Sequence, residues 1–304
     1  VNKMRRLVNH AFCKLPFEED WYRRRNCPAT YVGHPYFDDM RRQKLDQGFL
    51  QQIQDGRPLV TILPGSRRQE VHANLPWFLR TIDIVKLSVP NARFVVASFN
   101  EEQAAMAQEV VAACGPQTDV EIRVGRTREL IHAANCCLAC SGSVSLDLLH
   151  EAKPTVIHYR VGPVAYQAQR LLRRVKYITL VNLLAADDPF RADQDDYDPD
   201  TCPISQVPFP EYLTFQDRSS QMAHHLVRWL LNPECRQRVV ERLEELRSKV
   251  VQVGASRRGA EAILRQLGRS PTVIPRPHFL PRPSRAATAV WNSGSCASAE
   301  FAEQ

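Results

Sequence analysis

The feature that most limits the fold is a repeated alternation of short apolar runs and helical patterns between residues 55 and 185. Strands are predicted at the apolar or β-branched runs 59–63, 94–97, 120–124, 136–140, 155–159 and 177–181. Runs that are apolar throughout, rather than at alternate positions, indicate a parallel sheet with helices on both faces. Because strand–helix–strand connections are right-handed, the pattern predicts a doubly wound, Rossmann-like α/β domain.

The segments that flank this alternation predict different structure. Residues 1–54 carry a basic helix, a short strand and several turns, which we interpret as the remnant of a preceding domain and a linker. Residues 186–210 are acidic and proline-rich, as is typical of a surface insertion. Helices are expected at 218–231, 234–251 and 256–267, so the sheet domain is predicted to span residues 55–267. The composition of residues 268–304 indicates a disordered tail.

Composition limits the class of protein. The 304 residues are 44% hydrophobic and 24% charged, which is typical of a soluble globular protein. We see no run of 18 apolar residues and no secretory signal, so no transmembrane helix is expected. The net charge of +7 fits either a solubilising surface or attraction to phosphates or an anionic membrane. Aromatic residues do not alternate with the basic ones, so nucleic acid is not expected as a partner.

The cysteines and acidic clusters do not predict a metal site. Nine cysteines scattered through the chain fit reduced thiols in the cytosol better than disulfides. Cys137 and Cys140 form a Cys-x-x-Cys pair inside an apolar run, and no second pair has zinc spacing, so we interpret them as structural. Asp198 and Asp200 resemble a metal-binding Asp-x-Asp pair, but chance explains it in so acidic a segment. We expect neither a metal nor a cofactor.

Two strand-to-helix connections contain glycine and small hydroxyl residues. The first holds Gly65, Ser66 and Arg67, and the second holds Ser141, Gly142 and Ser143. A glycine at the carboxyl end of a parallel strand lets the backbone approach a ligand, and the following helix N-terminus favours an anion. The guanidinium of Arg67 can bind phosphate oxygens with two hydrogen bonds. Each connection alone fits an ordinary turn, but the pair predicts a ligand that carries phosphate.

Asp147 lies four residues beyond Ser143, on the same face of the predicted helix. A carboxylate there can accept the hydroxyl groups of a ribose, although charge complementarity with the helix N-terminus is an alternative. Neither connection matches the P-loop or the Gly-x-Gly-x-x-Gly dinucleotide motif. A P-loop ATPase and a dinucleotide dehydrogenase are therefore poorly supported.

These residues resemble a known family. In order, the chain contains LPFE (15–18), VGHP (32–35), LPGSRRQE (63–70), SGSVSLD (141–147), PTVIHYR (154–160), YITLVNLL (177–184) and PEYLTFQ (210–216). The set is similar to lipid-A-disaccharide synthase, a bacterial glycosyltransferase of the two-Rossmann GT-B type, over about residues 10–267. The resemblance implies transfer of diacylglucosamine from UDP to an acylated glucosamine 1-phosphate, with release of UDP.

The resemblance also implies roles for individual residues. The implied substrate-binding residues are Gly65, Ser66, Arg67 and Glu70 near the pyrophosphate, Ser141, Gly142, Ser143 and Asp147 near phosphate and ribose, and Asn182 in the donor site. Arg67 would stabilise the charge that develops on the leaving UDP without a metal. The chain departs from the family pattern at Ser143, usually Thr, at Asp147, usually Glu, and at Val181, usually Pro. The shorter carboxylate of Asp147 has less reach toward a ribose.

The general base is not identified. In the family a first Rossmann domain binds the acceptor and supplies the base, and only its last piece is expected here. His34 precedes Pro35 in a loop, and we interpret it as structural. Two other functions stay open: a catalytically incomplete UDP-sugar-binding module, and a GT-B-type UDP-N-acetylglucosamine epimerase. The basic charge and the acylated substrates predict a cytoplasmic protein held peripherally at the inner membrane, and a homodimer stays open.

Overall fold

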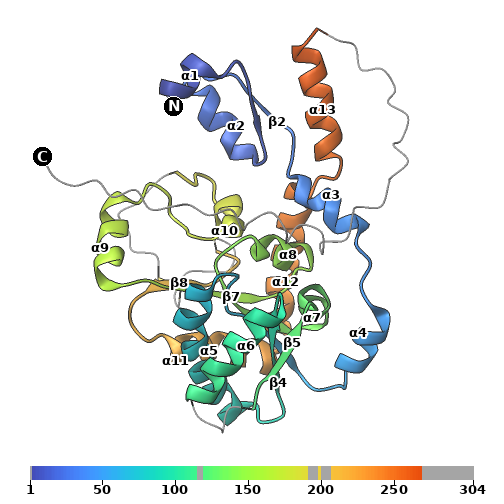
Figure 1. Ribbon diagram of the computed structural model, residues 1–304, viewed down its shortest axis with the longest axis vertical. Coiled ribbons are helices and arrows are strands. Elements are labelled where there is room, and N and C mark those ends of the chain that lie inside the picture. Colours follow the sequence, from blue (N-terminus) through green and yellow to red (C-terminus); the bar gives the residue numbers. More distant parts are fainter. Residues whose placement is uncertain (1, 115–118, 191–197, 200–206, 269–304) are drawn as a thin grey trace, which may run out of the picture. The chain divides into compact units, whose positions relative to one another are not determined.

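The computed structural model describes residues 2–114, 119–190, 198–199 and 207–268. Most of the predicted acidic insertion and residues 269–304 of the predicted tail, as well as Asp200, lie outside these ranges. Residues 1–259 form one compact unit, and a second unit begins at Ala260. The central sheet, on which the candidate site depends, lies entirely within the first unit (Figure 1).

The central sheet has six parallel strands in the order β5-β4-β3-β6-β7-β8. The strands are β3 (Leu59–Leu63), β4 (Arg93–Ser98), β5 (Glu121–Val124), β6 (Cys136–Cys140), β7 (Thr155–Arg160) and β8 (Glu211–Thr214). Every residue of β3 and of β6 is buried, because both central strands are covered on both faces. The chain winds outward from β3 in one direction and from β6 in the other. The predicted doubly wound α/β fold is therefore confirmed.

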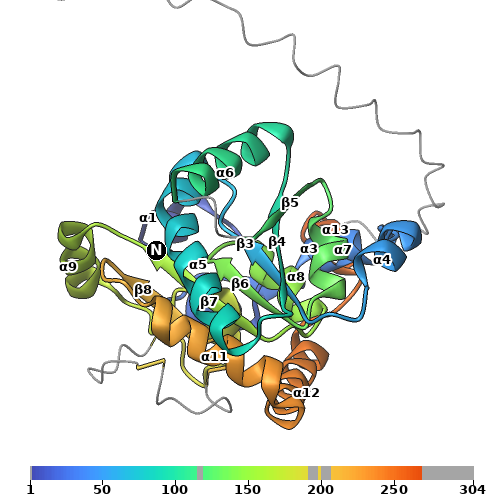
Figure 2. The ribbon, with the colours of Figure 1, turned by 90° about the horizontal axis from the view of Figure 1, so that it is seen from below.

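Helices cover both faces of the sheet (Figure 2). On one face α5 (Arg68–Ser88) packs against α6 (Glu101–Cys114) and α11 (Ser219–Leu231). The other face carries α4 (Gln47–Ile53), α7 (Thr127–Ala133), α8 (Val144–His150), α10 (Leu180–Ala185) and α12 (Pro233–Val250). Helix α12 has an apolar stripe at helical spacing, since Val239, Leu243, Leu246 and Val250 are buried while Val240 packs against the core. The remaining helices are α1 (Asn2–Leu7), α2 (Pro16–Arg23), α3 (Pro35–Arg42), α9 (Pro163–Leu172) and α13 (Ala255–Gln266).

One predicted strand is wrong. Residues 177–181 form no strand: α10 begins at Leu180, and the sixth strand of the sheet is β8. The backbone N–H groups of Ile178 and Thr179 donate to the carboxylate of Glu211, at 2.7 and 3.0 Å, rather than to a neighbouring strand. The β-branched residues suggested a strand, but the backbone N–H groups of this segment bond to a buried carboxylate that is distant in the sequence.

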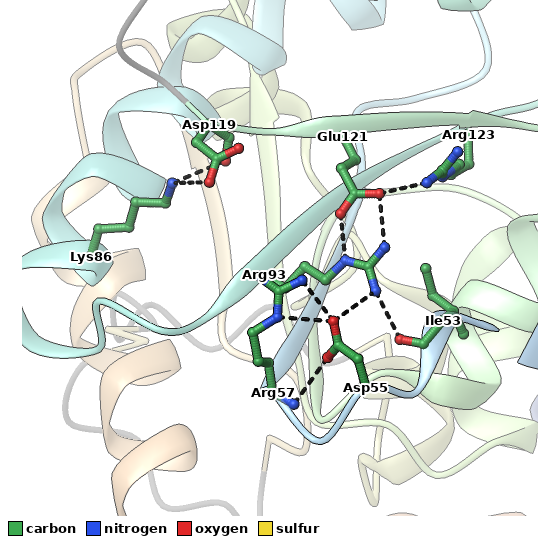
Figure 3. Close-up of polar contacts among 8 residues, drawn as sticks. All are labelled: Ile53, Asp55, Arg57, Lys86, Arg93, Asp119, Glu121 and Arg123. Carbon is green, nitrogen blue, oxygen red and sulfur yellow. Dashed lines mark hydrogen bonds and ion pairs between the residues drawn. The ribbon is translucent and has the colours of Figure 1, made fainter. Parts of the chain in front are cut away.

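The segment before residue 55 is joined to the sheet more closely than the sequence suggests. A separate two-stranded parallel sheet pairs β1 (Ala11–Cys13) with β2 (Ala29–Tyr31). Beyond it, Phe37 of α3 and Leu50 of α4 belong to the same hydrophobic core as the large sheet. At the amino ends of the strands, Arg93 donates to the carbonyl of Ile53 (2.9 Å) and to Glu121 (2.8 Å), as Figure 3 shows.

Candidate functional site

The two glycine-containing connections meet in one pocket. The pocket has a volume of about 630 Å³ and lies at the carboxyl ends of β3, β4, β6 and β7. The strand order reverses between β3 and β6, and the β3–α5 and β6–α8 connections diverge from that point. Open α/β sheets bind ligands at such a switch point. Eight of the nine predicted binding residues line this pocket: Gly65, Ser66, Arg67, Glu70, Ser141, Gly142, Ser143 and Asp147.

The β3–α5 connection needs glycine at position 65. Gly65 has a φ of +123°, and a Cβ atom there would lie 2.4 Å from the Cβ of Glu70. The Glu70 carboxylate accepts the backbone N–H groups of Ser66 (2.8 Å) and Arg67 (3.1 Å). The connection thus folds around the Glu70 carboxylate. This carboxylate accepts hydrogen bonds from backbone N–H groups that the sequence predicted to bind a phosphate. Glu70 caps the first turn of α5 in this way.

Arg67 is the cation that this connection presents to the pocket. Its side chain is 78% exposed, and its Nη1 lies 3.2 Å from Glu70 Oε1. So long and exposed an ion pair is weak, since solvent screens it and the side chain stays mobile. An incoming phosphate can therefore compete for the guanidinium at little cost in stability.

The β6–α8 connection is held by its serines. The Ser141 hydroxyl donates to the carbonyl of Ile178 (3.2 Å), and the Ser145 hydroxyl donates to the carbonyl of Gly142 (2.8 Å). Gly142 and Ser143 are exposed, and both line the same pocket as Arg67 and Ser66. A Cβ atom at Gly142 would meet no atom within 4 Å, so this glycine leaves open space beside the backbone.

Asp147 lines the pocket, is buried, and already accepts a hydrogen bond within the protein. The Tyr36 hydroxyl donates to Asp147 Oδ2. Burial raises the pKa of the Asp147 carboxyl, while the Tyr36 hydrogen bond acts in the opposite direction. Burial also raises the pKa of Tyr36, so this phenol stays protonated and keeps donating. A residue of α3 thereby orients the carboxylate that the sequence assigns to a ribose.

Sequence reasoning missed several residues of the pocket: Tyr36, Phe99, Gln103, Thr127, Arg128 and Tyr159. Gln103 joins two connections, because its amide donates to the Gly65 carbonyl (2.9 Å) and accepts the Phe99 N–H (2.7 Å). Arg128 adds a second cation and donates to Gln43 (2.8 Å). For four of them a signal was available, namely a position beyond a predicted strand, where parallel strands bring their carboxyl ends together: Phe99, Gln103, Thr127 and Arg128.

Asn182 and His34 lie outside the pocket. Asn182 is fully buried, and its amide donates to the Phe209 carbonyl and to Glu211 and accepts the Phe209 N–H, at 2.8, 2.8 and 3.0 Å. Its observed contacts hold α10 against β8, and it does not line the pocket described above. The His34 Nδ1 accepts the N–H of Tyr36 (3.3 Å) at the start of α3, a capping role that agrees with a structural interpretation.

No metal-binding cluster is found among the described residues. Within them, no three His, Cys, Asp or Glu side chains are grouped to hold a metal ion. Burial raises the pKa of Cys137 and of Cys140 to about 12, so both remain thiols inside β6. In the same described part of the chain, no helix is long and apolar enough to cross a membrane.

Two solved structures are similar to this chain in fold. The S. aureus MnaA–UDP complex has a TM-score of 0.55 and 11% identity, with 90% of this chain and 66% of that chain covered. A protein from Listeria monocytogenes assigned as a UDP-N-acetylglucosamine 2-epimerase has a TM-score of 0.55 and 9% identity, covering 90% of this chain and 64% of its own. At these identities the likeness concerns the fold alone.

Curated relatives give a more specific result. Lipid-A-disaccharide synthase of Idiomarina loihiensis is 34% identical over 190 residues, 62% of this chain and 50% of that protein. The enzyme of that name from Trichlorobacter lovleyi is 27% identical over 277 residues, 89% of this chain and 66% of that protein. The chain spans about half the length of the first relatives it matches. The family model described as lipid-A-disaccharide synthetase matches residues 1–191, and the chain therefore belongs to the lipid-A-disaccharide synthase family.

Proposed function

We propose that this chain is the UDP-sugar-binding part of a hexosyltransferase of lipid A biosynthesis. The proposed reaction transfers diacylglucosamine from UDP to an acylated glucosamine 1-phosphate and forms the lipid A disaccharide. The observation that carries the proposal is the pocket at the switch point, which both glycine-containing connections line together with the exposed Arg67. Family membership supports the choice of substrates.

The pocket's residues suit the leaving group of this reaction. When the bond between the sugar C1 and the UDP oxygen breaks, the β-phosphate gains negative charge. Arg67 is fixed at the start of α5, and its guanidinium can follow that charge with two hydrogen bonds. Ser143 and Gly142 line the same pocket as Arg67 and leave room for the phosphates. In this proposal Asp147, oriented by Tyr36, accepts a ribose hydroxyl.

The acceptor hydroxyl must lose a proton as it attacks the sugar C1. The described residues that line the pocket include no histidine or lysine. Its carboxylates are already engaged, Glu70 by the β3–α5 connection and Asp147 by Tyr36. We therefore assign the general base to a group outside this chain, and the chain alone is expected to bind the donor without turning it over.

Calorimetric titration with UDP and with UMP tests the pocket directly. UDP should bind more tightly than UMP, because UMP lacks the β-phosphate that we place beside Arg67. Equal affinities for the two nucleotides would contradict a pyrophosphate site. The Staphylococcus structure contains UDP, which makes UDP the appropriate first probe.

Turnover assays separate the proposed reaction from its alternatives. The chain is incubated with UDP-diacylglucosamine and the acylated glucosamine 1-phosphate, and in parallel with unacylated UDP-N-acetylglucosamine. UDP binding without product is the expected result for this chain alone, and disaccharide formation would contradict the assignment of the general base to a group outside it. Conversion of the unacylated sugar nucleotide would favour the epimerase and contradict the transferase.

We further propose that the protein is cytoplasmic and associates peripherally with the anionic inner membrane. The net charge of +7 and the acylated substrates support this location. Binding to anionic vesicles should weaken as salt is added, since salt screens the attraction. Sedimentation at several protein concentrations decides whether the chain forms the homodimer that the sequence left open.

A further inference from the structure

The groups that the β3–α5 connection could offer to a phosphate are already bonded to Glu70. Glu70 Oε2 accepts the backbone N–H groups of Ser66 (2.8 Å) and Arg67 (3.1 Å), and Glu70 Oε1 lies 3.2 Å from the Arg67 guanidinium. An ordinary capping glutamate needs only the N–H group of the residue before the helix, which here is Arg67. The two further contacts, with Ser66 and with the guanidinium, are ones that a phosphate would make.

The carboxylate is held in the wall of the proposed donor pocket. Glu70 lines this pocket, and its side chain is only 12% exposed. The backbone bends closely around it, since a Cβ atom at Gly65 would lie 2.7 Å from Glu70 Oε2. Gln103 holds the same bend by donating to the Gly65 carbonyl (2.9 Å). The negative charge of Glu70 therefore has a fixed place that is largely shielded from solvent, where its effect on another anion is strong.

A phosphate that enters the pocket meets this charge directly. The β-phosphate that we place beside Arg67 needs the donors that Glu70 uses. An N–H group cannot give a full hydrogen bond to two acceptors at once, and two anions on the same donors repel each other. Hydrogen bonds to Glu70 are therefore lost as hydrogen bonds to the phosphate form.

We propose that Glu70 is an internal competitor of the β-phosphate and that it lowers the affinity of the pocket for UDP. The inference deepens the proposed function and rests on it. With the pocket empty, the carboxylate keeps the N–H groups of Ser66 and Arg67 directed at one point. After sugar transfer, the same carboxylate returns to these groups and favours the release of UDP. Product release limits turnover in many enzymes, so weaker binding of the product has a use.

Calorimetric titration of Glu70→Gln with UDP and with UMP tests the competition. Glutamine keeps the length of the side chain and one carbonyl oxygen that can accept an N–H group, but it carries no charge. UDP should bind Glu70→Gln at least about fivefold more tightly than the wild type, while the affinity for UMP, which has no β-phosphate, should change by less than about twofold. Unchanged or weaker binding of UDP would overturn the proposal. So would an equal gain for UMP, because the effect would then not concern the β-phosphate.

Glu129→Gln is the matched control. Glu129 also lies in the first turn of a helix, its side chain is also 12% exposed, and its carboxylate also accepts a backbone N–H, that of Asp46 (3.2 Å). It does not line the donor pocket. This variant should bind both nucleotides as the wild type does. A gain in UDP affinity equal to that of Glu70→Gln would mean that the loss of any negative charge is sufficient, and the proposal would fall.

A crystal structure of the wild-type chain with UDP tests the same inference without a substitution, and so does not depend on how well Glu70→Gln folds. An oxygen of the β-phosphate, and not Glu70, should accept the N–H groups of Ser66 and Arg67. A Glu70 carboxylate that still accepts both N–H groups beside bound UDP would overturn the competition.

The titrations also separate this inference from the proposed function. A wild type that binds UDP with the same affinity as Glu70→Gln overturns the competition and leaves the donor pocket standing. Circular dichroism shows whether both proteins are folded. Absence of UDP binding in both folded proteins overturns the proposed function, and the competition with it.

Discussion

The two edges of the sheet use arginine in opposite ways. At the amino edge, Arg93 is only 11% exposed and donates to Glu121, Asp55 and the Ile53 carbonyl (Figure 3). At the carboxyl edge, Arg67 is mostly exposed and has one long contact with Glu70. A buried arginine with several acceptors fastens chain segments together, whereas an exposed one with a weak partner remains available to a ligand.

Two glutamates in the outer strands of the sheet also differ in their surroundings, and their pKa values shift in opposite directions. Glu121 begins β5 and Glu211 begins β8, so they occupy corresponding positions at opposite ends of the sheet. The hydrogen bond from Arg93 lowers the pKa of Glu121. Burial raises the pKa of Glu211 to about 7, even though Ile178, Thr179 and Asn182 donate to it. Both carboxylates hold chain segments together, but the charged form of Glu121 is stabilised by a partner, whereas the charged form of Glu211 is disfavoured by burial.

The largest expected effect comes from removing the amino-edge arginine. Arg93→Ala leaves Glu121 without its main partner and frees the Ile53 carbonyl, so it should lower the free energy of unfolding by about 2–3 kcal/mol. Urea denaturation measures this loss. The affinity for UDP should not change in the folded variant. Arg57→Ala, a neighbouring and more exposed arginine, serves as control and should cost much less. Equal losses in the free energy of unfolding for Arg93→Ala and Arg57→Ala would contradict the distinction between a buried and an exposed arginine.

The second effect is a dependence of stability on pH. The native state of Glu211 binds more protons than the unfolded state between about pH 4.5 and 7, so this group's contribution falls as pH rises. His158 acts in the opposite direction, because burial lowers its pKa to about 4 and its contribution rises with pH from about 4 to 6.5. Glu211→Gln should therefore change the slope by up to about 1.4 kcal/mol per pH unit, leaving a stability that rises with pH.

Urea denaturation of the wild type and Glu211→Gln at several pH values between 4.5 and 7 measures these slopes. Glu121→Gln is the matched control: because the pKa of Glu121 is lowered, its contribution changes only below about pH 4.5, so this variant should leave the slope between pH 4.5 and 7 unchanged. The same pH dependence in the wild type and in Glu211→Gln would mean that Glu211 titrates normally in the folded protein.

The carboxyl-edge arginine should affect binding and not stability. Arg67→Ala should weaken UDP binding by about 1.5–3 kcal/mol, the range for hydrogen bonds to charged groups. Arg67→Lys should restore only part of this, because an ammonium group cannot make two parallel hydrogen bonds to phosphate. Arg68→Ala is the control, since the neighbouring arginine is exposed and does not line the pocket. Calorimetric titration that finds equal affinities would reduce Arg67 to a helix-capping residue.

The smallest of the expected effects concerns Gly65, a residue on which both stability and binding depend. Gly65→Ala forces a side chain into a positive φ and against Glu70, which should cost about 1–2 kcal/mol and also weaken UDP binding. Gly142→Ala in the other connection has open space and should leave stability unchanged. Thermal denaturation of the two variants decides this, and equal melting temperatures would show that the connection after β3 adjusts to a side chain.

Much of the fold could be predicted because its signals are local. Continuous apolar runs identified β3, β6 and β7 with at most one residue of error, and helical spacing identified α11, α12 and α13. The strand predicted at 177–181 failed, because the Glu211 carboxylate there takes the place of a neighbouring strand. Neither the run of residues nor its spacing contains that partner, which lies about 30 positions further along the chain.

The pocket divides in the same way. Glycine and small hydroxyl residues after an apolar run predicted both connections, since their chemistry is visible one strand at a time. Tyr36 was missed because it comes from α3, and its hydrogen bond to Asp147 spans 111 positions. Asn182 was assigned to the donor site through its motif, but in the structure its amide is bonded to Glu211 and Phe209. A motif specifies a residue type, and packing determines which way that residue turns.

The sequence by itself determined the parallel sheet, the two connections at its carboxyl edge and the presence of Arg67 in the first of them. These features depend on the spacing of apolar residues and on turn-forming residues, which act over a few neighbouring positions. Only the tertiary structure decided that the Glu70 carboxylate closes the β3–α5 connection, that Tyr36 holds Asp147, and that Asn182 turns toward Glu211. Each of these depends on which groups meet after the chain folds. A buried polar group bonds to the partner that the packed elements bring within reach. Which residues stay exposed likewise depends on how those elements pack.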